Sequence, residues 1–259
     1  MRRRSFLSGV VVGVGGLAGL SGCVGTLGSS DPAVSTRAFP DRLDDLSPES
    51  VVDYVAAYEE TRVHNYHVEA GATEINVRAV ATFDYEADGG FHATTQHAGT
   101  VYRDRDGERD VGELYSGLVP YRVTTGSTLR LDVERVRARD VDGETAGDGG
   151  PVDPPLGVRV MNVTDRPREV TITVISGGGD GDPVSEVDVT VGVESAVVLA
   201  SMATAPGTYR TVARFEENGI VGEGRADVDL PGVERESNVD VLLSSDGLST
   251  RALPSFEYL

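Results

Sequence analysis

The sequence predicts two folded parts: an α+β domain with one helix laid on an antiparallel sheet, followed by an all-β sandwich. Three observations support this prediction. Apolar residues recur at helical spacing near residue 50, whereas apolar and polar residues alternate along much of the remaining chain. The 259 residues include 32 glycines and no tryptophan, which suits many short strands and turns. A run of acids, glycines and prolines at residues 140–155 separates the two patterned halves and predicts a linker.

The chain begins with features of an export signal. Three arginines, Arg2 to Arg4, precede an apolar, glycine-rich stretch from Gly9 to Leu20. That stretch is shorter than the roughly 20 apolar residues that a spanning helix needs, so residues 1–22 are predicted to be a signal peptide. The motif resembles the twin-arginine export signal, which carries folded proteins across the membrane. The residues that match it are Arg3, Arg4, Phe6 and Leu7.

The signal ends in a sequence that matches the lipobox of bacterial and archaeal lipoproteins. Its residues are Leu20, Ser21, Gly22 and Cys23, and Cys23 is the sole cysteine of the chain. A thiol at the mature N-terminus can take a lipid in thioether linkage, and small residues before it suit cleavage. A lone cysteine elsewhere is usually a small core residue, but here position and context agree. We therefore expect lipid attachment at Cys23, no disulfide, and a location on the extracellular face of the cell membrane.

Residues 23–45 are rich in Gly, Ser and Pro and are predicted to form a flexible tether. The first domain is expected over residues 46–139. Its helix should begin after Ser47, an N-cap residue followed by Pro48, and end before Gly71. One face of this helix is expected to be apolar, because Val51, Val55, Tyr58 and Arg62 recur at helical spacing with Tyr54 alongside.

Strand patterns follow the helix. Asp88-Gly89-Gly90 and Asp106-Gly107 are expected to form turns between them. One helix and a meander of strands together predict the α+β domain. The expected strands cover residues 75–85, 91–102, 118–123 and 129–136.

The second domain, residues 156–259, is predicted to be all-β. Short apolar alternations separated by regular turn signals are typical of a β-sandwich. Ala205 to Tyr209, just before an expected strand, resembles the tyrosine corner of immunoglobulin-like domains, in which the phenol bonds to backbone. The hairpin around Asn162 to Asp165 resembles the first turn of such modules. These motifs together predict an immunoglobulin-like sandwich.

From its signal through the first helix to its terminal hairpin, the chain resembles uncharacterised haloarchaeal lipoproteins with an immunoglobulin-like C-terminal part. The helix carries the matching residues Tyr58-Glu59-Glu60 on to Asn65. The resemblance implies a compartment and a fold, and it implies no activity. Archaeal lipids of this type carry two chains, so the resemblance also implies stable attachment to the membrane.

The charge agrees with that resemblance. The formal net charge is −19, and all 23 basic residues are arginine. Removal of the signal, which holds three arginines and no acid, would bring the charge to −22. Phosphate binding needs clustered cations, so nucleic acid is not expected as a partner. In molar salt the Debye length is about 3 Å, so these acids are expected to keep the surface hydrated rather than to steer ligands.

The four histidines lie between residues 64 and 97 and raise the possibility of a metal site. His64 and His67 share a helix face, whereas His92 and His97 point to opposite faces of a regular strand. At most three can therefore meet, and the low-ranked candidate ligands are His64, His67 and His97. The favoured interpretation places His64 and His67 on the solvated end of the helix and treats His92 and His97 as ordinary sheet residues. No metal or cofactor is expected.

Other motifs have simpler explanations. Residues 177–182 are interpreted as a hairpin loop rather than a calcium repeat, and Asp104, Asp106 and Asp110 as a charged turn that fails the EF-hand spacing. Asn162-Val163-Thr164 is a glycosylation sequon, whose occupancy the sequence leaves open. No Ser-His-Asp set or phosphate loop can be placed.

The sequence therefore favours a non-catalytic surface module that binds another envelope component or a solute. The alternative is an enzyme or metal-dependent protein that uses the histidines of the first domain. A concave pocket with convergent polar residues on that domain would favour the alternative.

Overall fold

The computed structural model describes residues 34–137, 152–179, 181–217 and 220–259, which form one α-helix and three β-sheets. The elements in chain order are α1 Pro48–Glu69, β1 Glu74–Ala87, β2 Gly90–Arg105, β3 Glu108–Tyr115, β4 Val119–Val123, β5 Thr128–Arg130, β6 Asp132–Arg137, β7 Leu156–Asn162, β8 Arg168–Ser176, β9 Pro183–Val191, β10 Ser195–Ala203, β11 Gly207–Glu217, β12 Ile220–Leu230, β13 Val239–Ser244 and β14 Gly247–Ala252, with a 3₁₀ turn at Gly177–Gly179. Predominantly antiparallel sheets with one helix confirm an α+β and β-sandwich composition.

The predicted start of α1 is confirmed, and the cause is a capping box. The Ser47 hydroxyl accepts a hydrogen bond from the backbone N–H of Ser50, whose side chain in turn accepts from the backbone N–H of Ser47. Two N–H groups that the helix cannot satisfy internally are thereby paired. The helix ends at Glu69, before Gly71 at φ +80°, a conformation that glycine adopts without steric cost.

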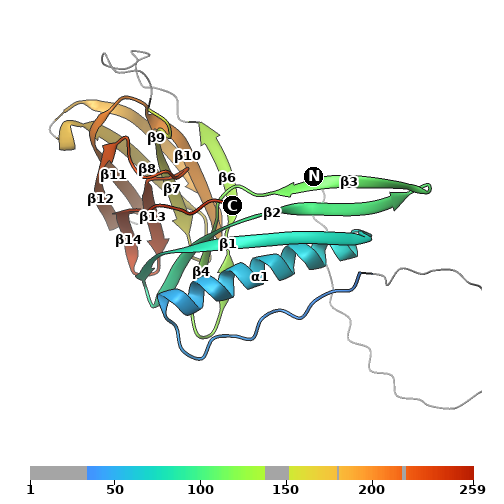
Figure 1. The fold of residues 1–259 in the computed structure, drawn as a ribbon. Coiled ribbons are helices and arrows are strands. Elements are labelled where there is room, and N and C mark those ends of the chain that lie inside the picture. The colour runs from blue at the N-terminus through green and yellow to red at the C-terminus, as the bar shows by residue number, and fades with distance from the viewer. Residues whose placement is uncertain (1–33, 138–151, 180, 218–219) are drawn as a thin grey trace, which may run out of the picture. The chain divides into compact units, whose positions relative to one another are not determined.

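Sheet A contains β1, β2, β4 and β5 in that order. Strand β2 pairs with β4 along residues 91–95 and with β3 along residues 98–105. Helix α1 lies along β1 and β2 and covers one face of the sheet (Figure 1). Asp88-Gly89 and Asp106-Gly107 form the expected hairpin turns, with positive φ at both residues of each pair. A Cβ at Gly99 would lie 1.9 Å from the Asn76 carbonyl oxygen, so only glycine permits the close approach of β1 and β2 there.

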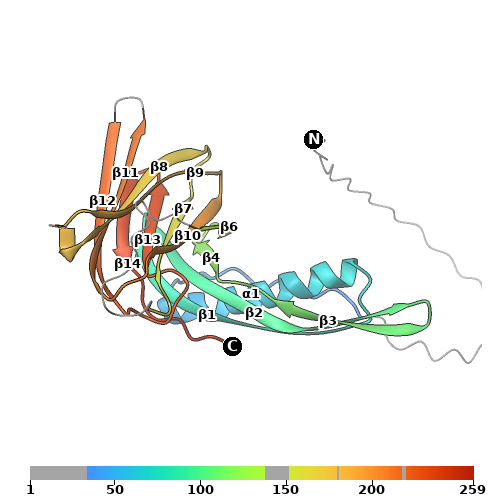
Figure 2. The same cartoon turned by 90° about the horizontal axis from the view of Figure 1, so that it is seen from above.

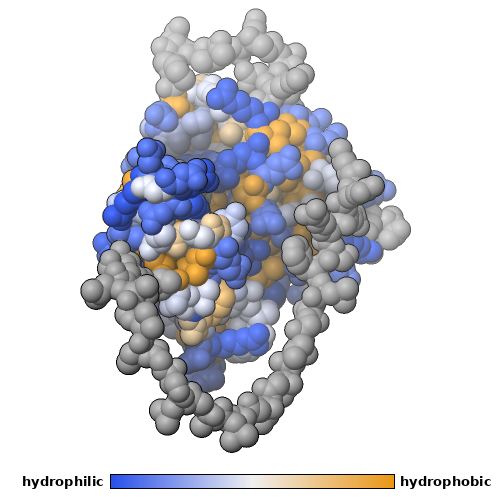
Figure 3. Space-filling model, turned by 90° about the vertical axis from the view of Figure 1, so that its right-hand side faces the viewer, coloured by the Kyte–Doolittle hydropathy of each residue, from blue (hydrophilic) through white to orange (hydrophobic). Residues whose placement is uncertain are grey.

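The hairpin of β2 and β3 extends away from the sandwich strands in both views of the ribbon (Figures 1 and 2). Strand β3 is exposed along most of its length, and Tyr115 at its end is 72% exposed. Figure 3 views the side toward which this hairpin extends and shows hydrophilic residues around separate hydrophobic patches.

The tether prediction is wrong for residues 34–45, which pack on α1. Phe39 lies against Tyr58 with ring centroids 4.8 Å apart, and the Asn65 side chain makes two hydrogen bonds to the backbone of Arg37, at 2.7 and 2.9 Å. Leu43 also packs against the helix core. The helix therefore has apolar contacts toward this segment as well as toward sheet A. Residues 23–33 lie outside the described residues.

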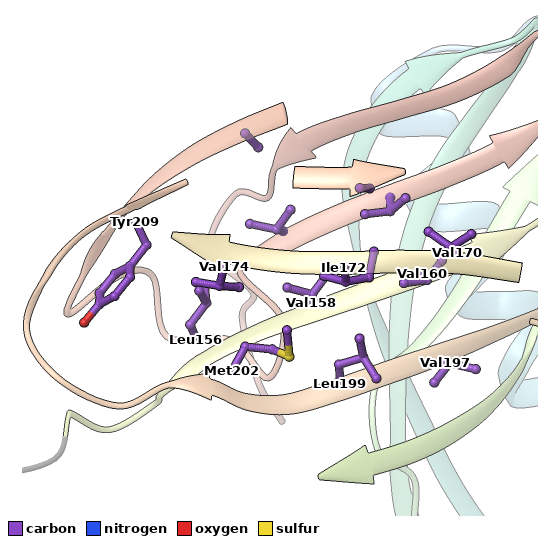
Figure 4. Packing of buried hydrophobic residues seen from close by; sticks show 14 of the residues in the cluster. Leu156, Val158, Val160, Val170, Ile172, Val174, Val197, Leu199, Met202 and Tyr209 are labelled. Carbon is purple, nitrogen blue, oxygen red and sulfur yellow. The ribbon is translucent and has the colours of Figure 1, made fainter. Parts of the chain in front are cut away.

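The β-sandwich consists of sheet B, ordered β14-β13-β7-β10-β6, and sheet C, ordered β12-β11-β8-β9. Its core lies between the two sheets, where Val158 and Leu199 of sheet B meet Ile172 of sheet C (Figure 4). Two pairs in sheet B are parallel: β13 with β7, and β6 with β10. Residues 177–179 lie between the antiparallel strands β8 and β9, as the hairpin-loop interpretation expected.

Sheet B is buried on both faces where β7 and β13 run. All seven residues of β7 and all six of β13 are buried. One face packs on sheet C, and the other packs on residues from sheet A and the chain that follows it. The second contact joins Met161 and Leu242 of sheet B to Tyr85 and Leu131.

The sequence segment expected to form the first domain also contributes to the sandwich. Strand β6 precedes the expected linker at residues 140–155, yet it forms an edge of sheet B. Residues 34–259 form one compact unit. Most of the expected linker, residues 140–151, lies outside the described residues. Val152 packs on the sandwich core and donates its N–H to the Thr204 carbonyl at 2.8 Å.

Candidate functional site

The predicted export and lipid-attachment residues, including Cys23, lie outside the described residues. No helix in the described part of the chain is long and apolar enough to cross a membrane.

The candidate histidine ligands make separate hydrogen bonds. His64 is buried, against the expectation of a solvated helix end, and its Nε2 donates to the Ser35 carbonyl at 3.0 Å. His67 Nδ1 accepts from Arg103 Nη2 at 3.0 Å. Burial first, and then the charge of Arg103, lower the pKa of His67. Over the described ranges, no three His, Cys, Asp or Glu side chains are grouped so that they could hold a metal ion.

His97 belongs to a cluster around the buried carboxylate of Glu59, in the middle of α1. The ring Nδ1 of His97 and the phenol of Tyr121 donate to the Glu59 carboxylate at 3.0 and 2.5 Å. Arg62 and Arg130 donate to the same carboxylate at 3.1 and 3.2 Å. The helix and strands β2, β4 and β5 thus meet at one side chain, which fixes how α1 lies on sheet A.

The Glu59 cluster resembles an acid–base site in composition but not in accessibility or charge state. Glu59 and Tyr121 are both 0% exposed. Burial alone would raise the pKa of Glu59, but hydrogen bonds from His97 and Tyr121 and the charge of Arg130 outweigh it and hold that pKa well below its usual range. Burial and the Glu59 charge raise the pKa of Tyr121. Near neutral pH the pair therefore stays carboxylate and phenol, so neither group is matched to proton transfer.

A second buried cluster joins sheet A to sheet B around Arg159. Its guanidinium donates to both carboxylate oxygens of Asp240, from Nε at 2.6 Å and from Nη2 at 2.5 Å. The two residues are neighbours on the parallel strands β7 and β13, so the strand register places the pair side by side. Arg159 also donates to Asp84 at 2.9 Å and to Thr94 at 2.6 Å, which belong to β1 and β2.

Arg235 completes this cluster from the segment before β13. Its Nη1 lies 2.8 Å from Asp84 Oδ1, and its Nη2 donates to the Thr94 hydroxyl at 2.6 Å. That hydroxyl donates to Asp84 at 2.6 Å. Burial would raise the pKa of Asp84, but the charges of Arg235 and Arg159 outweigh it and lower that pKa. The cluster is an ion-pair network closed to solvent, because both carboxylates and both guanidinium groups are buried.

His92 lies beside this network and stacks on Tyr85 with ring centroids 4.8 Å apart. It is 1% exposed, and neither ring nitrogen makes a hydrogen bond within the described residues. Burial, and then the charges of Arg122 and Arg159, lower the pKa of His92 to about 4. The ring is therefore neutral near pH 7.

The structure does not accommodate a glycan on Asn162. This side chain is 0% exposed, and its amide nitrogen donates to the carbonyls of Arg166, Val191 and Gly192 at 2.7, 3.2 and 2.9 Å. Its amide oxygen accepts from the backbone N–H and the hydroxyl of Thr164. The nitrogen that would carry the sugar is therefore occupied in fixing the turn between β7 and β8. The sequon in the folded protein is a structural motif rather than an accessible attachment site.

Sequence reasoning missed Glu59, Asp84, Arg159, Arg235 and Asp240. Arg159 and Asp240 stand at alternate positions of apolar strands, where a polar residue predicts a solvent-facing side chain. Only the packing of sheet A on sheet B changes that environment. Glu59 could have been suspected, because it lies four residues after Val55 and so shares the predicted apolar face of the helix. The other residues carry no local signal.

Comparisons with known proteins add no relative to this description of the site. No protein-family model matches the chain, and searches of curated proteins and of solved structures gave no significant match.

Proposed function

We propose that the protein is a lipid-anchored module on the extracellular face of the membrane, attached through Cys23, which binds an envelope component or a solute without catalysis. The sequence supports the address: a twin-arginine-like signal ends at a lipobox whose cysteine is unique in the chain. The strongly negative net charge and the absence of lysine support adaptation to a salty exterior and do not favour nucleic acid as a partner.

One observation carries the non-catalytic part of this proposal. The ion-pair network around Arg159 is closed to solvent, the Glu59 carboxylate and the Tyr121 phenol are buried as well, and both clusters hold elements together. A catalytic acid or base must reach its substrate and must have a pKa near the working pH. Glu59 and Asp84 meet neither condition, because both are buried and both have lowered pKa values.

We also propose that the sandwich is immunoglobulin-like. Strands β7 and β10 pair in one sheet while β8, β11 and β12 share the other, as strands B, E, C, F and G do in that fold. At the crossing from β10 to β11, the Tyr209 phenol donates to the Ala205 carbonyl at 2.9 Å, and this bond resembles that of a tyrosine corner. The parallel pairing of β13 and of β6 at the flanks of β7 and β10 departs from the all-antiparallel pattern.

The contact role can be tested by crosslinking in intact cells. Amine-reactive reagents are unsuitable because the chain has no lysine, so a photoreactive residue would be placed at exposed Tyr115 in one variant and at Ser245 in another. We expect a discrete adduct with an envelope component from at least one position. The adduct should be absent when Cys23→Ser frees the chain from the membrane. Failure to obtain a discrete adduct from either position would contradict the contact role.

A further inference from the structure

The two edges of sheet A differ in how they are protected. Strand β1 forms one edge, and there the carboxylate of Glu60 on α1 accepts a hydrogen bond from the backbone N–H of Ala79 at 2.8 Å. Strand β1 also carries a bulge between Phe83 and Tyr85. A covering helix and a bulge are among the devices that keep an edge strand from pairing with another chain.

Strand β3 lies on the other side of β2 and lacks these devices. Within the described residues it pairs with β2 alone. Its eight residues include no proline and no lysine, and their pairing with β2 has no bulge. All eight are exposed or half-buried, and they belong to the hairpin that extends away from the sandwich (Figure 2). The outer edge of β3 is therefore open to a further strand.

The hydrogen bonds of this hairpin determine which backbone groups of β3 are open. Residues of an antiparallel pair alternate between those that bond to the partner strand and those that bond outward. The Ser116 N–H donates to the His97 carbonyl at 2.9 Å, so the register assigns the even-numbered residues of β3 to bonding with β2. The N–H and C=O groups of Arg109, Val111 and Glu113 therefore point away from the sheet.

These three residues are complementary to themselves in one antiparallel register. A second copy of β3 can bond only through the same odd-numbered residues. When Val111 lies opposite Val111 of the second copy, Arg109 lies opposite Glu113 on both sides of the twofold axis. A shift of the register by one step in either direction sets Val111 opposite Arg109 or Glu113 instead. Apolar matching and charge complementarity therefore select the same register.

The side chains are accessible for this pairing. Val111 is 54% exposed and lies beside Tyr102 of β2. Arg109 pairs with Glu74 and lies over the Tyr102 ring, 4.2 Å from its centroid. The Arg109 and Glu74 side chains are 55% and 49% exposed, so their pair stabilises the single chain little and the guanidinium can turn to another carboxylate. Glu113 makes no hydrogen bond or ion pair in the part of the chain that the structure describes.

We propose that β3 pairs with β3 of a second copy of this chain, so that the two copies of sheet A join into one antiparallel sheet around a twofold axis at Val111. About six backbone hydrogen bonds form in this register. Backbone bonds of this kind supply affinity, and the cross-strand side-chain pairs fix the register. The interface is small, so the association is weak and reversible. This inference goes beyond the proposed binding role and does not depend on it.

The test is sedimentation equilibrium of the full chain in molar sodium chloride, where the Debye length is about 3 Å and the net charge of −19 opposes association least. Every protein carries Cys23→Ser, so that no lipid holds copies together. We expect a reversible dimer at protein concentrations up to about 1 mM. Val111→Pro should abolish this dimer, because proline lacks the N–H that faces the second copy and leaves the bonds to β2 in place. The matched control Val111→Thr keeps the N–H and should dimerise almost as well as the wild type.

Exchange of charges tests the register and does not require the proline variant to fold. Arg109→Glu sets a glutamate opposite Glu113, and Glu113→Arg sets an arginine opposite Arg109. Each variant alone should therefore dimerise about tenfold more weakly than the wild type. A mixture of the two variants should associate again, because both contacts then join opposite charges.

Three results would overturn the proposal. The wild type could stay monomeric up to that concentration, a folded Val111→Pro could dimerise as tightly as Val111→Thr, or the mixture of charge variants could associate no better than either variant alone. Because the measurement uses purified protein in solution, its failure is distinct from a failure of membrane attachment or of crosslinking in cells.

Discussion

Asp84 is the residue on which the junction between sheets A and B most depends. It is fully buried, and it neutralises two buried guanidinium groups that belong to β7 and to the segment before β13. Breaking a buried ion pair by removing one partner leaves an uncompensated charge, which typically costs about 3–5 kcal/mol. The junction therefore tolerates loss of this carboxylate poorly.

Asp84→Ala is expected to lower the free energy of unfolding by about 3–5 kcal/mol, because Arg159 and Arg235 would lose an anion in a site without solvent. Denaturant unfolding in high salt measures the change. The matched control is Asp227→Ala, which removes the carboxylate of a surface pair with Arg210 and should have little effect. Equal losses in the two variants would contradict the role of the buried network.

The stability of the protein should depend on pH through His92. Its pKa is about 4 in the folded chain against 6.5 for the free side chain, so the unfolded chain binds the proton first as pH falls. Stability is then fully present above pH 6.5 and declines toward pH 4, by about 3 kcal/mol for a shift of this size. His92→Phe keeps a ring for Tyr85 to stack on and should flatten this part of the profile. If the wild type and His92→Phe show the same slope between pH 6.5 and 4, the assignment is wrong.

The residues of both clusters show where prediction from sequence stops. Val158 and Val160 alternate along β7 and lie in the sandwich core. The same alternation would place Arg159 toward solvent, because a single strand pattern cannot indicate that a second sheet covers the opposite face. The histidines were the candidate metal ligands, yet each of the four is held by local packing or by a single polar partner. Neither the covering sheet nor these contacts can be recognised in the linear sequence.

At the scale of elements, local rules predicted the helix well. Ser47, Pro48 and the glycine at position 71 define both ends of α1, since caps depend on neighbouring residues alone. The assignment of residues 34–45 to a tether failed for the opposite reason. Their Gly, Ser and Pro neighbours suggested a flexible segment, but Phe39 and Leu43 find apolar partners on a helix that follows them in sequence.

Sheet B has a second apolar face, which points away from sheet C, and strand β6 forms one of its edges. Both features matter for a fragment that contains only the sandwich. Met161, Leu242 and Leu253 are buried on that face. A fragment of residues 154–259 would lack β6 and would expose these side chains. We expect it to retain β structure but to bind a hydrophobic dye and to unfold at a lower temperature than the full chain in the same high salt. Circular dichroism melts and dye fluorescence of the two proteins provide the measurement. An equal melting temperature with no dye binding would show that the sandwich is complete without these residues.

At the scale of the whole molecule, net charge is the dominant feature. With a predicted mature charge of −22, self-repulsion should be large where screening is weak. We expect a lower melting temperature at about 0.1 M salt, where the Debye length is about 10 Å, than in molar salt. Thermal melts in sodium chloride across that range, with a neutral osmolyte as control, measure the effect. A melting temperature that does not change with salt would contradict adaptation to a salty exterior.

The central claim is that this body is held to the membrane through Cys23, and the intact mass of the wild-type protein purified from its own membrane tests it most directly. We expect a chain that begins at Cys23 and carries the added mass of a lipid, and we expect Cys23→Ser to be released from the membrane or to keep its signal. An unmodified chain that begins at Met1 would contradict the claim.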